Sequence, residues 1–277
     1  MKLQSILLDD EVRWGIREDE SLRILNDDWD ACVARLLSQE TSFVDGERYL
    51  PNSAITCSLP LGAKNKILCV GLNYRSHVAE ANRDMPPYPS VFPRFADSLV
   101  AHGQPIWLPK HSAKFDFEGE LAIVIGKGGR HIAARDAFEH IAGYTCMAEN
   151  SVRDYQKHNA QVTPGKNFER SGALGPWIVS KHDVPDPTTL RVVTRLNGEV
   201  MQDASVADLI YPIPALIEYI SRFTRLSPGD VIATGTPAGV GSSRTPPRFM
   251  QAGDSLEVHI EHIGTLQNTV IDEPVQP

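Results

Sequence analysis

Three acidic residues recur at every second position of the stretch FDFEGELAIVIGK: Asp116, Glu118 and Glu120. If this stretch is a β-strand, their carboxylates point to one face, because side chains alternate between the two faces of a strand. The apolar run LAIVIG that follows is typical of a buried strand. Carboxylates that enter a core require protons, cationic partners or a metal. The spacing therefore indicates a cation site at Glu118 and Glu120, although a charged face open to solvent fits it equally well.

The ligand types indicate which cation such a site would hold. Oxygen ligands without sulfur favour a hard cation such as Mg²⁺, Mn²⁺ or Ca²⁺. The four cysteines form no CxxC pair, so a structural zinc site is not indicated. A third acidic ligand is available in Glu149, within GYTCMAENSVRDYQ. By itself, an acidic residue in a loop is more often a solvated side chain.

A histidine and a glutamate stand three positions apart in NYRSHVAE. On a helical turn, His77 and Glu80 would be neighbours. A carboxylate beside an imidazole orients the ring and raises its basicity, which is what a general base needs to activate water. A His–Glu pair on the surface is the more frequent explanation of this spacing.

Two glycine-containing loops supply further polar groups. The segment PGKNF places Lys166 where an ammonium group can meet a substrate carboxylate or oxyanion, although most loop lysines are solvated. The segment ATGTPAGVG (233–241) has neither the ending of a P-loop nor the spacing of a dinucleotide fingerprint. We expect it to approach a small ligand closely, with Thr236 offering a hydroxyl; a plain loop is the alternative. No GxSxG motif indicates a serine hydrolase.

The elements that must position these groups fall into two predicted regions, 1–61 and 62–277. The first holds two short strands, KLQSILL and RWGIR, and a helix over about 28–37. The second is β-rich, with a hairpin at Asn197-Gly198 and a helix that begins near Pro214 and runs through ALIEYISRFT. The fold class is therefore α+β, with strands predominating.

Charge and hydropathy exclude several classes of function. The formal net charge of −8 argues against binding to nucleic acids or anionic membranes. The sequence contains no stretch of about 18 apolar, uncharged residues, the length needed to span a membrane. The N-terminal residues lack the features of a signal peptide, so we expect a cytoplasmic protein with reduced thiols.

In this order, the motifs resemble those of the fumarylacetoacetate hydrolase family over about residues 66–270. The resemblance rests on five segments: GLNYRSHVAE, FDFEGELAIVIGK, GYTCMAENSVRDYQ, PGKNF and GDVIATGTPAGVG. It implies a catalytic domain with a mixed β-sandwich roll, preceded by a small N-terminal domain, in a homodimer.

The resemblance also implies roles for individual residues. Mg²⁺ or Mn²⁺ would be held by Glu118, Glu120 and Glu149, and His77 and Glu80 would activate water. The residues that match substrate-contacting positions are Lys166, Gln156, Thr236 and Arg94. The family usually has Asn-Asp where this chain has Ala148-Glu149. Because glutamate is one methylene longer, we expect the third carboxylate to be displaced by up to about 1.5 Å.

The function that we expect from these features is hydrolysis of a carbon–carbon bond in a small 2-oxo or 1,3-dicarbonyl acid resembling an acylpyruvate. The enolate would leave with help from the metal and Lys166. Two alternatives stay open. The same site supports decarboxylation, tautomerisation, isomerisation or hydration of a 2-oxo acid, and a non-catalytic member with weakened metal binding is also compatible. The His77–Glu80 pair favours hydrolysis, because the other reactions depend on it less directly.

Overall fold

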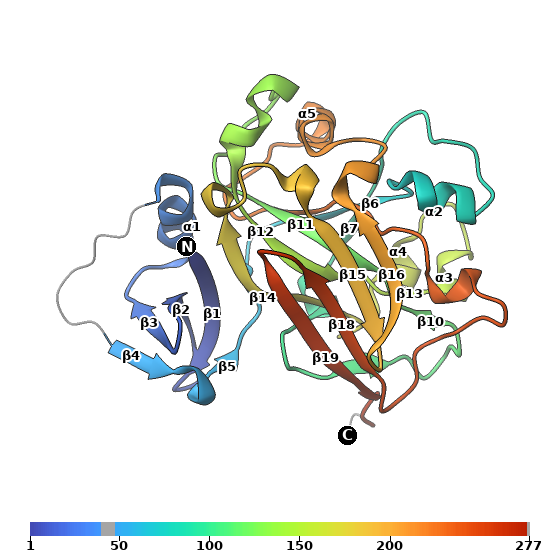
Figure 1. Ribbon diagram of the computed structural model, residues 1–277, viewed down its shortest axis with the longest axis horizontal. Helices are drawn as coiled ribbons and strands as arrows, with labels where there is room; N and C mark the ends of the chain where they lie inside the picture. The colour runs from blue at the N-terminus through green and yellow to red at the C-terminus, as the bar shows by residue number, and fades with distance from the viewer. Residues whose placement is uncertain (40–47, 276–277) are drawn as a thin grey trace.

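The computed structural model describes residues 1–39 and 48–275. Its main element is a mixed twelve-stranded sheet (Figure 1). In spatial order the principal strands are β4 (Arg48–Pro51), β3 (Ser21–Leu25), β2 (Glu11–Arg17), β1 (Lys2–Leu8), β14 (Gly172–Ser180), β12 (Ile141–Ala148), β11 (Gly119–Ile125), β17 (Val231–Ala233), β6 (Ile67–Gly71) and β7 (Ser90–Arg94). Two short strands extend it: β5 (Thr56–Cys57) beside β1, and β8 (Leu99–Ala101) beside β14.

A second, five-stranded sheet packs against the central part of the first. Its order is β16 (Glu199–Ser205), β15 (Arg191–Leu196), β18 (Ser255–Ile260), β19 (Gly264–Asp272) and β9 (Ile106–Leu108). A two-stranded ribbon joins β10 (Phe115–Asp116) to β13 (Ser151–Val152). The helices are α1 (Trp29–Ser38), α2 (Arg75–Glu80), α3 (Arg153–Gln156), α4 (Thr163–Lys166) and α5 (Ile213–Phe223). The α+β class with predominant strands is thus confirmed.

Strand β11 is buried on both faces because both sides of the large sheet are covered. Leu121, Ile123 and Ile125 belong to the core shared with the second sheet. Ala122 and Val124 point to the opposite face, into a core that includes residues of α1. This arrangement explains the unbroken apolar run in the sequence, since neither face of the strand meets water.

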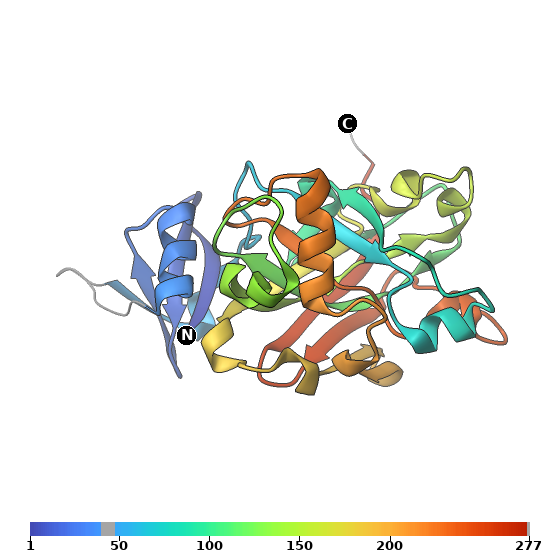
Figure 2. The ribbon, with the colours of Figure 1, turned by 90° about the horizontal axis from the view of Figure 1, so that it is seen from above.

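The N-terminal strands continue the large sheet. Strand β1 pairs with β14, so that Lys2 lies opposite Val179 and Leu3 opposite Ile178. Figure 2 shows these strands and α1 at one end of the molecule. The division at residue 61 stays a prediction, and the backbone hydrogen bonds between β1 and β14 cross it.

The helices and the turn that were predicted from local sequence signals are present in the structure. Asp28 caps α1 by accepting a hydrogen bond from Ala31 N at 2.9 Å, as its residue type favours. Asn197 and Gly198 turn between β15 and β16 with φ of 54° and 81°, the left-handed values that this dipeptide tolerates. The predicted second helix is α5, which begins at Ile213. No helix within residues 1–39 and 48–275 is long and apolar enough to cross a membrane.

Candidate active site

The acidic stretch divides where β10 ends and β11 begins. Phe117 and Glu118 lie between the two strands and belong to neither. The prediction that Asp116, Glu118 and Glu120 share one face of a single strand is therefore wrong, because only Glu120 belongs to β11. Asp116 also lies apart from the other two carboxylates. Its carboxylate turns instead to Arg153, whose Nε donates at 2.7 Å, and to the backbone N–H groups of Gly241 and Ser242 at 2.7 and 2.9 Å. These hydrogen bonds from distant segments determine where the Asp116 carboxylate points, and the alternation of a strand does not.

Glu118 and Glu120 instead meet Glu149. One carboxylate oxygen from each lies within 4.8 Å of those of the other two, and all three residues are buried. Glu149 reaches this place because it directly follows β12, which pairs antiparallel with β11. Its N–H donates to the carbonyl of Glu118 at 2.8 Å. The pairing of the two strand ends therefore assembles three carboxylates from segments about thirty residues apart, as the separation of 118 and 149 indicates.

Two of these carboxylates have cationic partners. Lys166 Nζ lies 2.6 Å from Glu118 Oε2 and also contacts Glu149 Oε2. Arg153 Nη2 lies 2.6 Å from Glu118 Oε1, and Arg94 Nη1 lies 2.8 Å from Glu149 Oε1. Burial raises the pKa of Glu118, but the charges of Arg153 and Lys166 outweigh burial and hold that pKa well below its ordinary value. Glu118 is therefore ionised inside the protein.

Glu120 lacks such a partner. Its carboxylate accepts one hydrogen bond, from Gly235 N at 2.7 Å, and it forms no ion pair with any residue that the structure describes. Burial, followed by the negative charge of Glu149, raises the pKa of Glu120 well above its ordinary value. A divalent cation among the three carboxylates would supply the missing positive charge. Because the donors are all carboxylate oxygens, the cluster fits Mg²⁺ or Mn²⁺.

Helix α2 holds the histidine. Its first turn is anchored by Ser76, whose Oγ donates to Asp208 Oδ2 at 2.6 Å. His77 Nδ1 lies 3.3 Å from Glu80 Oε2, and Glu80 Oε1 accepts from Gly239 N at 2.8 Å. Burial raises the pKa of Glu80, but the hydrogen bonds from His77 and Gly239 lower it overall. With Nδ1 engaged by a carboxylate, Nε2 is the ring nitrogen available to a ligand.

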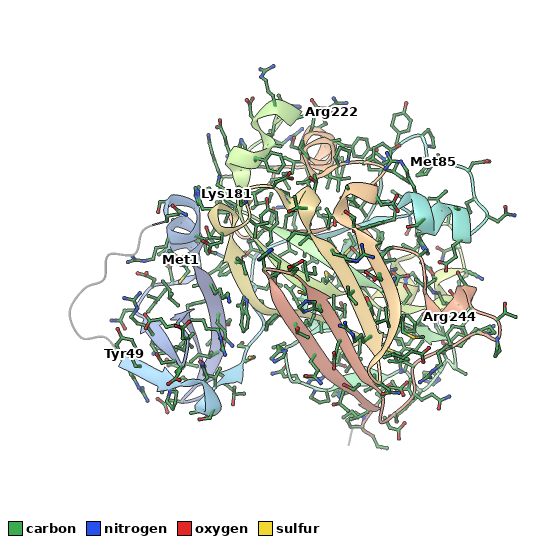
Figure 3. All side chains as sticks on the ribbon, viewed as in Figure 1. Met1, Tyr49, Met85, Lys181, Arg222 and Arg244 are labelled. Carbon is green, nitrogen blue, oxygen red and sulfur yellow. The ribbon has the colours of Figure 1, made fainter. Side chains whose placement is uncertain are left out.

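A cavity of about 600 Å³ opens above the carboxylates. Seven of the predicted site residues line it: His77, Glu118, Glu120, Glu149, Gln156, Lys166 and Thr236. Arg83 and Lys157 also line it, and neither forms an ion pair with a residue in the described ranges. The loops that carry Met85 and Arg244, labelled in Figure 3, contribute Arg83 and Ser242 respectively to its wall. Figure 1 shows α2, α3 and α4 on the side of the molecule away from the N-terminal strands.

The structure places the other two predicted residues behind this wall. Glu80 supports His77. Arg94 is 3% exposed and does not line the cavity. Its guanidinium contacts Glu149 Oε1, Asn150 O and the hydroxyls of Ser98 and Ser171. In this arrangement Arg94 holds the longer side chain of Glu149 in place, and its predicted contact with substrate stays a prediction.

Sequence reasoning missed Gln202, Arg83 and Lys157. Gln202 is 1% exposed and bonds both Gly119 and Thr236, which are 83 and 34 residues away in the chain. No local pattern marks it, since it stands within an ordinary hairpin strand. Arg83 and Lys157 follow short helices, and only the folded chain brings them to one cavity.

Comparison with known proteins places these features in context. The family model described as fumarylacetoacetate hydrolase C-terminal matches residues 66–271. The mitochondrial oxaloacetate tautomerase FAHD2A of Homo sapiens is 42% identical over 224 residues, which cover 80% of this chain and 71% of that protein. The oxaloacetate tautomerase YisK of Bacillus subtilis is 41% identical over 215 residues, covering 76% and 71%. The crystal structure of a 2-hydroxyhepta-2,4-diene-1,7-dioate isomerase from Mycobacterium marinum superposes with a TM-score of 0.83 at 33% identity, covering 99% of this chain and 100% of that one.

Proposed function

Since the chain belongs to the fumarylacetoacetate hydrolase family of enzymes, we propose that it is a metal-dependent tautomerase of a small 2-oxo dicarboxylic acid resembling oxaloacetate. The reaction moves one proton between a carbon atom and the neighbouring oxo oxygen. The observation that carries the proposal is the buried cluster of Glu118, Glu120 and Glu149 at the base of a cavity that His77 also lines. The names of the relatives favour the tautomerase alternative over the hydrolysis expected from the sequence.

The three glutamates would hold Mg²⁺ or Mn²⁺. A cation bound there supplies Lewis-acid stabilisation of the negative charge that develops on a substrate oxygen. Lys166 adds a fixed positive charge at the base of the cavity, beside Glu118 and Glu149. The support for a cation is the buried Glu120 carboxylate, which forms no ion pair with a described residue and whose pKa is raised despite the nearby charge of Lys166.

His77 is the residue that we assign to proton transfer. Nε2 would take a proton from the carbon beside the oxo group, and the imidazolium would return it to the oxo oxygen to give the enol. The reverse sequence gives the keto form, so that no atom is gained or lost. Glu80, ionised at neutral pH, stabilises the imidazolium through its contact with Nδ1.

The charges on the cavity wall suit an acidic substrate. The acidic lining residues are the three glutamates at the base, whereas Arg83 and Lys157 on the wall have no acidic partner in the described chain. A dicarboxylic acid would place one carboxylate near the base and leave the second near these two side chains. We therefore keep a small oxo acid as the proposed class of substrate, and among such acids we favour those with two carboxylates.

A direct test follows the absorbance of enol-oxaloacetate after mixing with the purified chain and Mn²⁺ or Mg²⁺. We expect faster approach to the keto–enol equilibrium, with the loss of most catalysis in Glu118→Gln and His77→Gln. Glu199→Gln, which changes an exposed carboxylate, serves as the matched control. Mass spectrometry distinguishes the reactions, because tautomerisation conserves mass whereas decarboxylation gives pyruvate. Full catalysis by Glu118→Gln would refute the proposal.

Hydrolysis of an acylpyruvate is the second candidate. The pair formed by His77 and Glu80 supports it, because a histidine oriented by a carboxylate can activate water. Measuring acylpyruvate cleavage in the same preparation separates the two, since only hydrolysis yields two acids. Absence of both reactions, together with Mn²⁺ binding no tighter than millimolar by calorimetry, would favour the non-catalytic alternative. The homodimer and the cytoplasmic location stay predictions.

A further inference from the structure

Gly119 separates the two neighbouring glutamates of the carboxylate cluster, and two side chains bind its backbone. Its N–H donates to Gln202 Oε1 at 2.9 Å, and its carbonyl accepts from Thr236 Oγ1 at 3.0 Å. Gln202 Nε2 in turn donates to Thr236 Oγ1 at 2.8 Å. The three residues therefore form a closed hydrogen-bonded ring. A further bond, from Gln202 Nε2 to Pro237 O at 2.8 Å, attaches the ring to the glycine-rich loop.

The ring occupies a position where a neighbouring strand is missing. Strand β17 pairs with β11 only from Ala122 to Val124 and ends at Ala233. Beyond it the chain continues as Thr234-Gly235-Thr236-Pro237, and proline has no N–H to offer. An unpaired buried backbone group is costly. Gln202 and Thr236 thus supply the hydrogen bonds that a strand would otherwise give to Gly119.

Local packing requires glycine at position 119. A Cβ there would lie 2.0 Å from Thr194 Oγ1 and 3.2 Å from Val258 Cγ1. Thr194 stands directly opposite Gln202 in the hairpin of β15 and β16. The absence of a side chain at 119 therefore allows the second sheet to come close enough for Gln202 to reach the backbone between the two glutamates.

We propose that Gln202 is a positioning residue for the cation site. Through the ring it fixes the two peptide groups that flank Gly119, and these groups carry Glu118 and Glu120. Their separation and direction determine whether both carboxylates can reach one ion. Thr236, which lines the cavity, takes part in the same hydrogen-bonded ring through its hydroxyl. This assignment rests on the proposed cation site and adds the element that holds its geometry.

The test measures Mn²⁺ binding to the full chain, without substrate, by isothermal titration calorimetry and by the EPR spectrum of the bound ion. Gln202→Met removes both polar groups of residue 202, and Thr236→Val removes only the hydroxyl. We expect each to weaken Mn²⁺ binding by about 10-fold to 100-fold, the usual effect of losing a group that orients metal ligands. The EPR spectrum should broaden or split differently, because the ligands no longer hold one arrangement.

Thr234→Val is the matched control. Thr234 Oγ1 also donates to a carbonyl of β11, that of Leu121, at 2.9 Å. Leu121 O already accepts from Thr234 N at 3.0 Å, and it lies outside the Glu118–Glu120 pair. This variant should bind Mn²⁺ as the unchanged chain does. Circular dichroism of the metal-free variants establishes that each is folded, and Thr236→Val decides the question if Gln202→Met does not fold.

The outcomes separate this inference from the cation site itself. Unchanged Mn²⁺ affinity and spectrum in folded Gln202→Met and Thr236→Val would overturn the positioning role and leave the site standing. An equal loss in Thr234→Val would also overturn it, since the effect would not depend on the ring. If the unchanged chain binds Mn²⁺ no better than Glu118→Gln, the cation site and the positioning role fail together.

Discussion

Lys166 Nζ lies 2.6 Å from Glu118 Oε2, with both side chains buried, and the same ammonium contacts Glu149. A lysine thus lies within the carboxylate cluster that we assign to a divalent cation. Burial lowers the pKa of Lys166, but the charges of Glu118 and Glu149 outweigh burial and raise it above its ordinary value. The ammonium therefore stays charged, and it offsets part of the repulsion among the three glutamates.

Replacing this lysine should destabilise the protein chiefly when metal is absent. In Lys166→Met, two buried carboxylates lose a partner, and breaking a buried pair costs about 3–5 kcal/mol. Saturating Mn²⁺ should recover part of that loss by replacing the positive charge. Thermal unfolding with EDTA and with Mn²⁺ measures both effects, and Lys64→Met provides an exposed control. If Mn²⁺ does not reduce the difference in Tm between the variant and the unchanged chain, the assignment of the cluster as a cation site is contradicted.

Glu80 gives a prediction about acid stability. Its pKa in the folded protein is lowered, because hydrogen bonds from His77 and Gly239 outweigh the effect of burial. A depressed pKa stabilises the fold above the pKa of the unfolded chain, about 4.3 for glutamate, and this contribution disappears as the pH falls through the folded value. Glu80→Gln cannot titrate, so its Tm should fall less steeply below about pH 4.5. Parallel curves for the two proteins would show that Glu80 contributes nothing to this dependence.

The proton-transfer role of His77 separates chemistry from metal binding. His77→Gln removes the base but leaves the three glutamates in place, so kcat should fall by about 10²-fold to 10⁴-fold. Mn²⁺ affinity should stay unchanged, whereas Glu118→Gln should lose both. Calorimetry and enol absorbance on the same preparations provide the comparison, with His111→Gln as an exposed control. Unchanged kcat in His77→Gln would assign proton transfer to another group.

The sequence predicted those parts of the fold that depend on near neighbours. The capped helix α1, the Asn197-Gly198 turn and helix α5 follow from residues within a few positions of one another. The i, i+2 spacing likewise indicated that Glu118 and Glu120 lie together, although only Glu120 belongs to a strand. These features can be predicted from sequence because the residues that produce each one lie within the same short segment.

What the sequence could not predict depends on distant contacts. Asp116 leaves the cluster because Arg153 and the amides of Gly241 and Ser242 bind it. Gln202 reaches Gly119 only because two sheets face each other. The extension of the large sheet by β1 similarly depends on β14, more than 160 residues away. The family resemblance pointed to Glu149 as the proposed third ligand, whereas its local sequence alone favoured an ordinary loop residue.

The cavity wall gives a prediction about substrate charge. Arg83 and Lys157 line the cavity and form no ion pair with a described residue, so a second substrate carboxylate would meet both. Because the two side chains are exposed, each contact should be worth no more than about 1 kcal/mol. We therefore expect Arg83→Ala or Lys157→Ala to raise KM for oxaloacetate up to about fivefold, with kcat nearly unchanged. The increase in KM should shrink as salt screens the charges.

Arg135→Ala, which changes an exposed arginine outside the cavity, is the control. Equal KM values for the three variants at low salt would exclude a distal carboxylate at this wall.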